Sequence, residues 1–280
     1  MSAVRSSEAG EAMQWGSARG HAWVEAQELL DKLFQPFEDI LVDAVGAVAG
    51  HCVLDIGCGT GSTTVAIARR LHAGGGIVGA DISEPMIAAA RARAERERVP
   101  ATFVRGDAQT YAFEPASYDT IVSRFGVMFF DDSVRAFANL HRAAKDGAAL
   151  RAAVWRNAAD NPFMTVAERA AAPLLSNLPV RKPDEPGQFA FGDPQHVHDI
   201  LKRSGWSAVD LRPLDIACTL PEKDLASYLT RLGPVGIALQ GTDVQTRVRV
   251  VDTVRAAFDP YVHGADVRFT AACWMIEARA

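Results

Sequence analysis

The chain has 280 residues, of which 49% are hydrophobic and 22% charged. These proportions are typical of a globular protein and exclude a disordered, collagenous or coiled-coil chain. With 29 Lys and Arg against 34 Asp and Glu, the formal net charge is −5, so a nucleic acid partner, which would select a basic surface, is not expected.

The cysteines and the lack of long apolar runs favour a protein of a reducing, aqueous compartment. The four cysteines form no C-x-x-C pair, so neither a metal site nor a disulfide framework is predicted; they are Cys52, Cys58, Cys218 and Cys273. The N-terminal sequence has no apolar signal-peptide core, and no run of ~18 uninterrupted apolar residues occurs. We therefore expect a soluble, cytoplasmic protein with no membrane partner.

The predicted elements begin with two consecutive helices. Between Gly20 and Ala49 the apolar residues recur at helical spacings, and only Pro36 interrupts the pattern. After Gly50 short β-branched runs alternate with helical stretches. Strands are predicted over 51–56, 77–81, 102–106, 118–123 and 148–155, with crossover helices over 60–72, 84–98 and 133–145. Such alternation indicates a mostly parallel sheet covered on both faces.

The alternation loosens after Trp155, where several prolines and the segment 180–187 predict an insertion. A helix over 193–204 and a strand over 206–216 follow, then helices over 222–232 and 244–258 and a last strand over 267–277. We expect one α/β domain of Rossmann-like, doubly wound type. Its core would comprise 50–156, 193–216 (a helix and a strand) and 266–280, with helical lid segments at 1–49, 157–192 and 217–265.

A glycine-rich turn follows the first strand. The sequence VLDIGCGTG, from Val53 to Gly61, has glycine at 57, 59 and 61. Glycine allows backbone conformations with φ > 0 and lets a ligand approach the chain where a Cβ would block it. A helix begins near Thr60, and its free amides favour electron-rich ligand groups. The turn therefore predicts a cofactor-binding loop.

Three further markers follow the next three strands. Asp81 ends the second strand. Its separation from Gly57 along the sequence is that at which an acid can accept hydrogen bonds from ribose hydroxyls. GDAQ, residues 106–109, follows the third strand, and SRFGVMFF, residues 123–130, follows the fourth. Because open parallel sheets bind ligands at the carboxyl ends of their strands, the joint placement of these markers predicts one cofactor site.

These sequences resemble the motifs of the class I S-adenosylmethionine-dependent methyltransferases, in particular the small-molecule, methyltransferase type 11 or UbiE-like group. VLDIGCGTG is similar to motif I, and GADIS, GDAQ and DTIVSRFGVMFF are similar to the next three motifs. The resemblance covers residues 53 to about 155. A dinucleotide-binding G-x-G-x-x-G fingerprint fits less well, because its last position, counted from Gly57, is Ser62. The resemblance implies seven strands, the last of them antiparallel.

The resemblance also implies roles for residues of the first loop. Gly57, Gly59 and Gly61 would line the methionine part of S-adenosylmethionine, whose product is S-adenosylhomocysteine. Asp55 and Thr60 would brace the loop.

Further contacts are implied at the ends of the later strands. Asp81 would hold both ribose hydroxyls. Arg124 and Phe125 would lie near the sulfonium. The other implied cofactor-binding residues surround the adenine, and they are Ile82 and Met86, with Asp107 and the amide of Ala108 at its edge.

No catalytic residue is assigned from the sequence. The sulfonium already makes its methyl group electrophilic, and orientation of the two reactants can supply roughly 7–11 kcal/mol in favourable cases. A general base would help a hydroxyl acceptor. The histidines that could serve are better explained as surface or capping residues, and they are His21, His141, His196 and His198.

Aromatic and apolar residues outside the core are expected to form an acceptor pocket. The candidates are Trp15, Trp23, Trp155, Asn157 and Phe163, with the segments FAFG at 189–192 and LGPVG at 232–236. Each could equally pack in the core, but together they suggest a lid over a small, fairly apolar acceptor. The sequence does not specify whether oxygen, nitrogen or carbon accepts the methyl group. It also does not distinguish a monomer from a homodimer.

Two other hypotheses remain open at this point. One is an NAD-dependent oxidoreductase on the same strand-helix plan, which would bind NADH and not S-adenosylhomocysteine. The other is a protein that binds the cofactor as a sensor or subunit without turnover.

Overall fold

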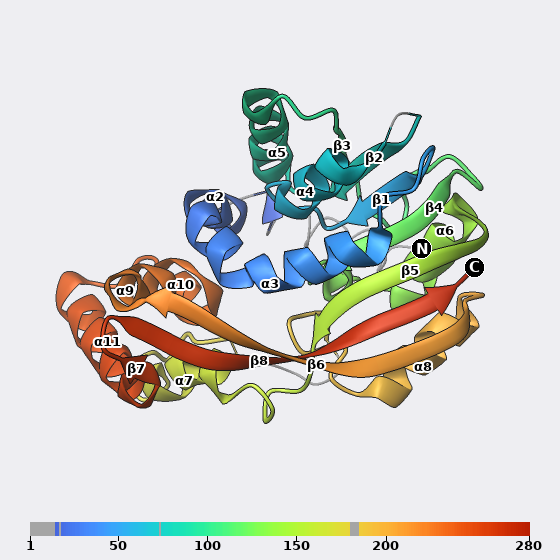
Figure 1. Ribbon diagram of the computed structural model, residues 1–280. Coiled ribbons are helices and arrows are strands. Elements are labelled where there is room, and N and C mark those ends of the chain that lie inside the picture. The colour runs from blue at the N-terminus through green and yellow to red at the C-terminus, as the bar shows by residue number, and fades with distance from the viewer. Residues whose placement is uncertain (1–14, 17, 73, 180–184) are drawn as a thin grey trace.

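The computed structural model describes residues 15–16, 18–72, 74–179 and 185–280, and its centre is a sheet with strand order β3-β2-β1-β4-β5-β8-β6 (Figure 1). Five strands run parallel: β1 (Cys52–Ile56), β2 (Gly76–Asp81), β3 (Thr102–Arg105), β4 (Tyr118–Arg124) and β5 (Ala144–Trp155). Strand β8 (Asp266–Arg279) lies antiparallel between β5 and β6 (Ser207–Pro221). The predicted Rossmann-like sheet with an antiparallel last strand is confirmed. The two-residue β7 (Val262–His263) pairs with β8 beside the main order.

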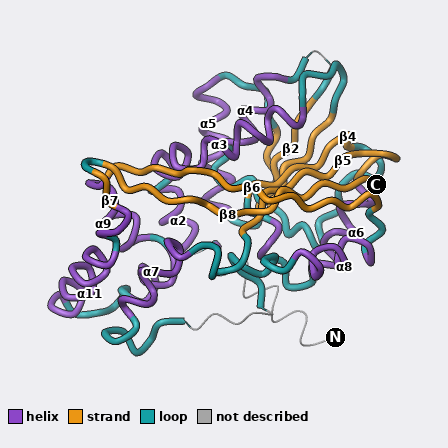
Figure 2. Tube along the Cα trace, turned by 60° about the horizontal axis from the view of Figure 1, so that its bottom comes forward, coloured by secondary structure: helices purple, strands orange, loops and turns teal. Residues whose placement is uncertain are grey.

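Helices cover both faces of the sheet, as Figure 2 shows. On one face lie α3 (Gln27–Val45), α4 (Ser62–Arg70) and α5 (Glu84–Glu97), and on the other α6 (Ser133–Ala143) and α8 (Pro194–Arg203). In the central strand β1, Val53 packs in a cluster with Ile67 of α4, whereas Leu54 packs in a cluster with Phe137 of α6. Burial on both sides explains why this strand is almost continuously apolar.

The two N-terminal helices are present, but the break between them lies elsewhere than predicted. Helix α2 (Ala18–Glu25) ends one residue before Ala26, and Pro36 lies inside α3. A proline removes one backbone hydrogen bond from a helix. Burial of Phe34, Phe37 and Leu41 on either side of Pro36 offsets that loss, because the apolar face must stay continuous to cover the sheet.

Strands β6 and β8 are longer than predicted and extend past the edge of the other strands (Figures 1 and 2). The expected boundary at residue 217 therefore falls within β6, which runs to Pro221 because buried Cys218 and Leu220 continue its period-two pattern. The extension reaches α9 (Glu222–Arg231), α10 (Gly233–Ala238), α11 (Val244–Ala257) and the 3₁₀ turn Asp259–Tyr261. The short α10 was not predicted, because its six residues include two glycines and a proline, which have low helix propensity.

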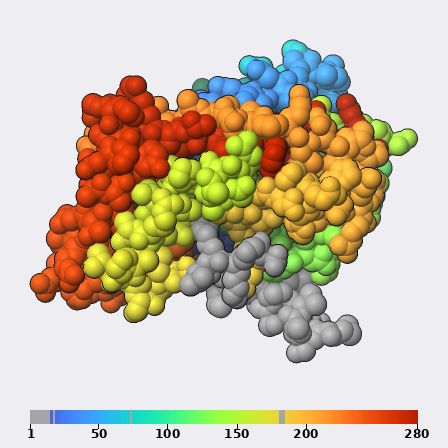
Figure 3. All heavy atoms as spheres, turned by 90° about the horizontal axis from the view of Figure 1, so that it is seen from below, coloured from blue at the N-terminus to red at the C-terminus, as the bar shows by residue number. Residues whose placement is uncertain are grey.

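These C-terminal helices form an outer lobe together with α7 (Pro162–Ala171), which packs against α11 (Figure 3). We use outer lobe below for α7, α9, α10 and α11. Among the described residues, no helix has the length and apolar character needed to cross a bilayer.

Candidate cofactor and acceptor site

One large cavity lies at the carboxyl ends of the parallel strands and continues to the outer lobe. Its volume is about 1400 Å³, above the ~300–1,000 Å³ usual for a single small-molecule site. Eleven of the predicted cofactor residues line it: Asp55, Gly57, Gly59, Thr60, Asp81, Ile82, Met86, Asp107, Ala108, Arg124 and Phe125. The five predicted acceptor residues line it too, namely Trp15, Trp23, Trp155, Asn157 and Phe163. The cavity therefore has room for a cofactor and a second molecule.

The glycine loop has the backbone that its sequence predicts, with φ of 66°, 54° and 82° at Gly57, Gly59 and Gly61. A Cβ at Gly57 would lie 2.6 Å from the Cα of Gly126, so the loops after β1 and β4 touch there. A Cβ at Gly59 would meet only the Met86 sulfur, at 3.9 Å. Gly59 thus leaves open space on the cavity side, where a ligand can approach the backbone.

Gly61 does not line the cavity. A Cβ there would lie 2.9 Å from Ala90 Cβ of α5 and 3.1 Å from the Phe103 ring of β3. Its left-handed backbone precedes Ser62, so α4 begins there and not at Thr60. Close packing of the loop on α5 and β3 is sufficient to explain the third glycine, and its predicted contact with the methionine part of the cofactor stays a prediction.

Asp81 is fixed by backbone amides. The Gly59 N–H donates to Asp81 Oδ2 and the Ser83 N–H donates to Oδ1, each at 2.9 Å. Burial raises the pKa of Asp81, while these hydrogen bonds lower it. Each carboxylate oxygen accepts more than one hydrogen bond, so the group keeps acceptor capacity for a diol in the cavity.

The loop after β3 is held by side chains that the sequence analysis did not single out. Gln109 Nε2 donates to both oxygens of Asp107 at 3.1 Å, and its Oε1 accepts from the Asp132 N–H at 2.7 Å. Asn139 Nδ2 donates to the Ala108 carbonyl at 2.8 Å. Gln109 lies within the GDAQ marker, but no local pattern connects Asn139 of α6 to this loop. These contacts fix the orientation of Asp107 and Ala108.

Asp55 lies beneath the glycine loop and is only 1% exposed. Thr64 Oγ1 donates to its Oδ2 at 2.6 Å. Burial raises the pKa of Asp55 to about 7, against the opposing effects of the Thr64 hydrogen bond and the Arg124 charge. This carboxyl ties the end of β1 to α4, on the two sides of the glycine loop.

Phe125 has a backbone conformation unusual for a residue with a side chain, with φ of 64°. Its ring stacks on Trp155, with centroids 4.8 Å apart and planes 16° from parallel. Phe34 and Phe37 of α3 pack edge-on against it, at 5.3 and 5.0 Å. The cluster joins the ends of β4 and β5 to α3 and forms an aromatic wall of the cavity.

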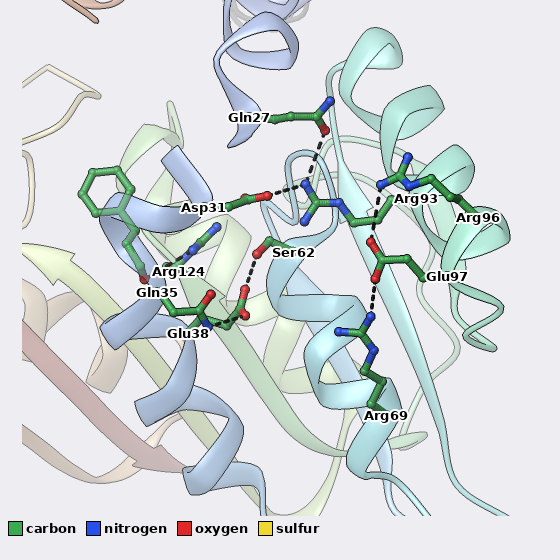
Figure 4. Close-up of polar contacts among 11 residues, drawn as sticks. Gln27, Asp31, Gln35, Glu38, Ser62, Arg69, Arg93, Arg96, Glu97 and Arg124 are labelled. Carbon is green, nitrogen blue, oxygen red and sulfur yellow. Dashed lines mark hydrogen bonds and ion pairs between the residues drawn. The ribbon is translucent and has the colours of Figure 1, made fainter. Parts of the chain in front are cut away.

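Polar contacts hold α3 over the site (Figure 4). Arg93 of α5, 8% exposed, donates to Asp31 at 2.5 Å and to Gln27 at 3.3 Å. Ser62, at the start of α4, donates to Glu38. Because Asp31 and Gln27 also line the cavity, the helix is fixed where its residues cover the strand ends.

A second aromatic group lies on the outer-lobe side. Phe163 contacts Phe258 edge-on at 5.0 Å and Tyr228 at 6.4 Å, and all three line the cavity. Of the segment 189–192, all but Phe191 line the cavity, and that residue packs in the core; Leu232 to Val235 also contribute. The cofactor-side loops and this apolar chamber share one continuous space.

The histidines remain without a catalytic assignment. Of the four considered, His196 lines the cavity, from the exposed start of α8. His141 packs edge-on against Trp206, at 5.3 Å. In the parts of the chain that the structure describes, no cluster of His, Cys, Asp and Glu could hold a metal ion.

Comparison with known proteins identifies the class. Residues 53–147 match the family described as "Methyltransferase domain". With the four motifs and the strand order, this match shows that the chain contains a methyltransferase domain similar to those of the class I S-adenosylmethionine-dependent methyltransferases, which are enzymes. The cofactor is S-adenosylmethionine, so the NAD-dependent alternative is not supported.

Individual relatives share different lengths of the chain. It is 29% identical over 184 residues to a demethylmenaquinone methyltransferase of Renibacterium salmoninarum, covering 63% of this chain and 75% of that protein. It is 35% identical over 102 residues to nocamycin O-methyltransferase of Saccharothrix syringae, which covers 36% of each. Among solved structures, the YcgJ protein from Bacillus subtilis shares the fold, with a TM-score of 0.59, 16% identity and coverage of 88% and 98%. The chain thus spans only part of the length of some curated relatives.

Proposed function

We propose that this enzyme transfers the methyl group of S-adenosylmethionine to a small, mainly apolar molecule bound in the chamber under the outer lobe. The observation that carries the proposal is the continuity of the cavity from the strand ends to that chamber. A volume of about 1400 Å³ suits two adjacent molecules.

The residues at the strand ends fit this cofactor. The open space beside Gly59 admits a ligand to the backbone, and Asp81, held by two amides, faces the same cavity as a hydrogen-bond acceptor. In our proposal Asp81 binds the ribose hydroxyls, Ile82 and Met86 pack on the adenine, and Asp107 with Ala108 binds its edge. Thr60 braces the loop, and Arg124 and Phe125 lie nearest the reacting end.

When bound, S-adenosylmethionine supplies a sulfonium that carries an electrophilic methyl group. The chain then has to align an acceptor with the bond from methyl to sulfur, which can supply roughly 7–11 kcal/mol. Rigid aromatic walls favour such alignment, and the stacked rings of Phe125 and Trp155 form one wall of the cavity. Side chains of the lid segments exclude water, which competes for the methyl group.

The acceptor chamber favours a flat, apolar molecule. Trp23, Trp155 and Phe163 line it, and the methylated compounds named for the relatives are a demethylmenaquinone and nocamycin. In the proposal, Trp15 and Asn157 border the acceptor at the rim. The segments 1–49, 157–192 and 217–265 act as the lid, although residues 1–14, 17 and 180–184 lie outside the described part of the chain.

The free cysteines favour a reducing compartment, which we propose is the cytoplasm. All four thiols are unpaired, and three of them are buried. The proposed assembly is a monomer or a homodimer, with neither nucleic acid nor membrane as a partner. Size-exclusion chromatography with light scattering distinguishes the two assemblies.

The experiment that tests the proposed function measures S-adenosylhomocysteine binding by isothermal titration calorimetry. Asp81→Ala should abolish most of the affinity while the circular dichroism spectrum stays unchanged. Asp119 lies at the amino end of β4, away from the carboxyl ends of the strands that line the cavity, so the Asp119→Asn variant should bind S-adenosylhomocysteine as the wild type does. Retained affinity in the Asp81 variant would count against the proposed site. Transfer of labelled methyl groups to a panel of quinones, phenols and amines then tests turnover.

A further inference from the structure

Tyr228 is a polar residue at an apolar wall of the chamber. It comes from α9, where it and Leu229 line the cavity, and its ring packs near Phe163. Around it, Phe163, Met164 and Phe258 present hydrocarbon or sulfur to the same space. A phenol in such a wall is well placed to bind a polar atom of an otherwise apolar ligand.

The hydroxyl of Tyr228 has only a weak partner. Its hydrogen bond in the described structure goes to the sulfur of Met164, at 3.8 Å. A thioether is a weak acceptor compared with an oxygen atom, and Tyr228 is only partly buried. Met164 lines the cavity as well and is unbranched, so the hydroxyl can exchange the sulfur for a ligand oxygen with little rearrangement.

The protonation state of Tyr228 fixes the direction of the bond. Burial raises the pKa of the phenol, with a smaller effect of Cys218 in the same sense. The group therefore stays protonated at neutral pH and is available as a donor.

From these contacts we infer that Tyr228 is a specificity-determining residue that donates a hydrogen bond to an oxygen of the methyl acceptor, a carbonyl or a phenolic oxygen on a flat apolar skeleton. The inference rests on the proposed function. Tyr228 is thus a positioning residue, since it holds the end of the acceptor that lies against α9 and takes no part in breaking the bond between methyl and sulfur.

The test uses two probes with one skeleton, 1-tetralone, which carries a carbonyl, and tetralin, which lacks it. Their affinities for the full chain saturated with S-adenosylhomocysteine are measured by isothermal titration calorimetry. One net hydrogen bond corresponds to about a five- to tenfold preference for the ketone. Tyr228→Phe should abolish this preference by weakening 1-tetralone alone. Because the hydroxyl has no strong partner in the protein, the melting temperature should not fall.

Tyr261→Phe is the matched control, since Tyr261 also contacts Phe163, at 5.2 Å, but does not line the cavity. It should keep the wild-type preference. The inference is overturned if Tyr228→Phe retains the preference for the ketone, or if neither probe binds the wild-type complex. Failure of S-adenosylhomocysteine itself to bind would instead refute the proposed function, so the two failures are distinguishable.

Discussion

Replacing Asp55 by Asn should change how the stability of the protein depends on pH. Asp55 is buried and its pKa is raised from 3.8 to about 7. A raised carboxyl pKa means that the folded state holds the proton more tightly than the unfolded state. Below pH 3.8 Asp55 is protonated in both states and does not lower the free energy of unfolding. As the pH rises towards 7 the unfolded state loses the proton first, and the free energy of unfolding falls by about 4 kcal/mol.

Between pH 5 and pH 8 this single group should lower the free energy of unfolding of the ligand-free wild type by about 2.5 kcal/mol. Asparagine preserves the shape and can still accept from Thr64, but it does not titrate. Urea unfolding at both pH values should therefore show a smaller loss for Asp55→Asn than for the wild type, by that amount.

Asp119→Asn is the control for this measurement. Burial raises the pKa of Asp119, but the hydrogen bonds from Lys145 and from the Cys52 amide outweigh that effect and keep it low. Asp119 is thus ionised in both states across the range, and its variant should follow the wild type. Equal losses for wild type and Asp55→Asn would refute the reasoning, because Asp55 would then be ionised in the folded protein.

Two further predictions concern the loop and the helices above it. Gly57→Ala forces a Cβ to within 2.6 Å of the Gly126 backbone and should cost at least about 3 kcal/mol in urea unfolding. Gly59→Ala should cost only about 1 kcal/mol, from its left-handed backbone, yet weaken S-adenosylhomocysteine about tenfold or more in calorimetry; equal behaviour of the two variants would contradict these roles. Asp31→Ala leaves Arg93 buried with Gln27 but without its charged partner and should cost about 3 kcal/mol. Adding Arg93→Met should restore part of that loss, and purely additive losses would show that the charge pair is not coupled.

The cofactor side could be predicted from the sequence because its signals are local. Gly57 and Gly59 lie in the turn after β1 and Asp81 ends β2, and parallel strands bring their carboxyl ends together in any such sheet. Gly61 shares the local signal, but the sequence does not reveal that Ala90 and Phe103 pack against it.

Other features depend on contacts between distant parts of the chain. Asn139 of α6 supports the turn at Ala108, 31 positions away, and Tyr228 contacts Met164 across 64 positions. Pro36 predicts a break by local rules, yet the apolar face of α3 keeps the helix continuous across the sheet. These are cases in which tertiary packing overrides local preference.

The length of β6 and β8 has a consequence for how this enzyme can diversify. The hydrogen-bonded ladder that completes the sheet continues without interruption, apart from one irregularity near Ser207, to the start of α9. The helices α9, α10 and α11 are therefore joined to the core sheet by a continuous pair of antiparallel strands. If the proposed acceptor chamber is correct, exchange of residues 222–261 should change which acceptor is methylated, while the core strands that end at the glycine loop and Asp81 stay the same.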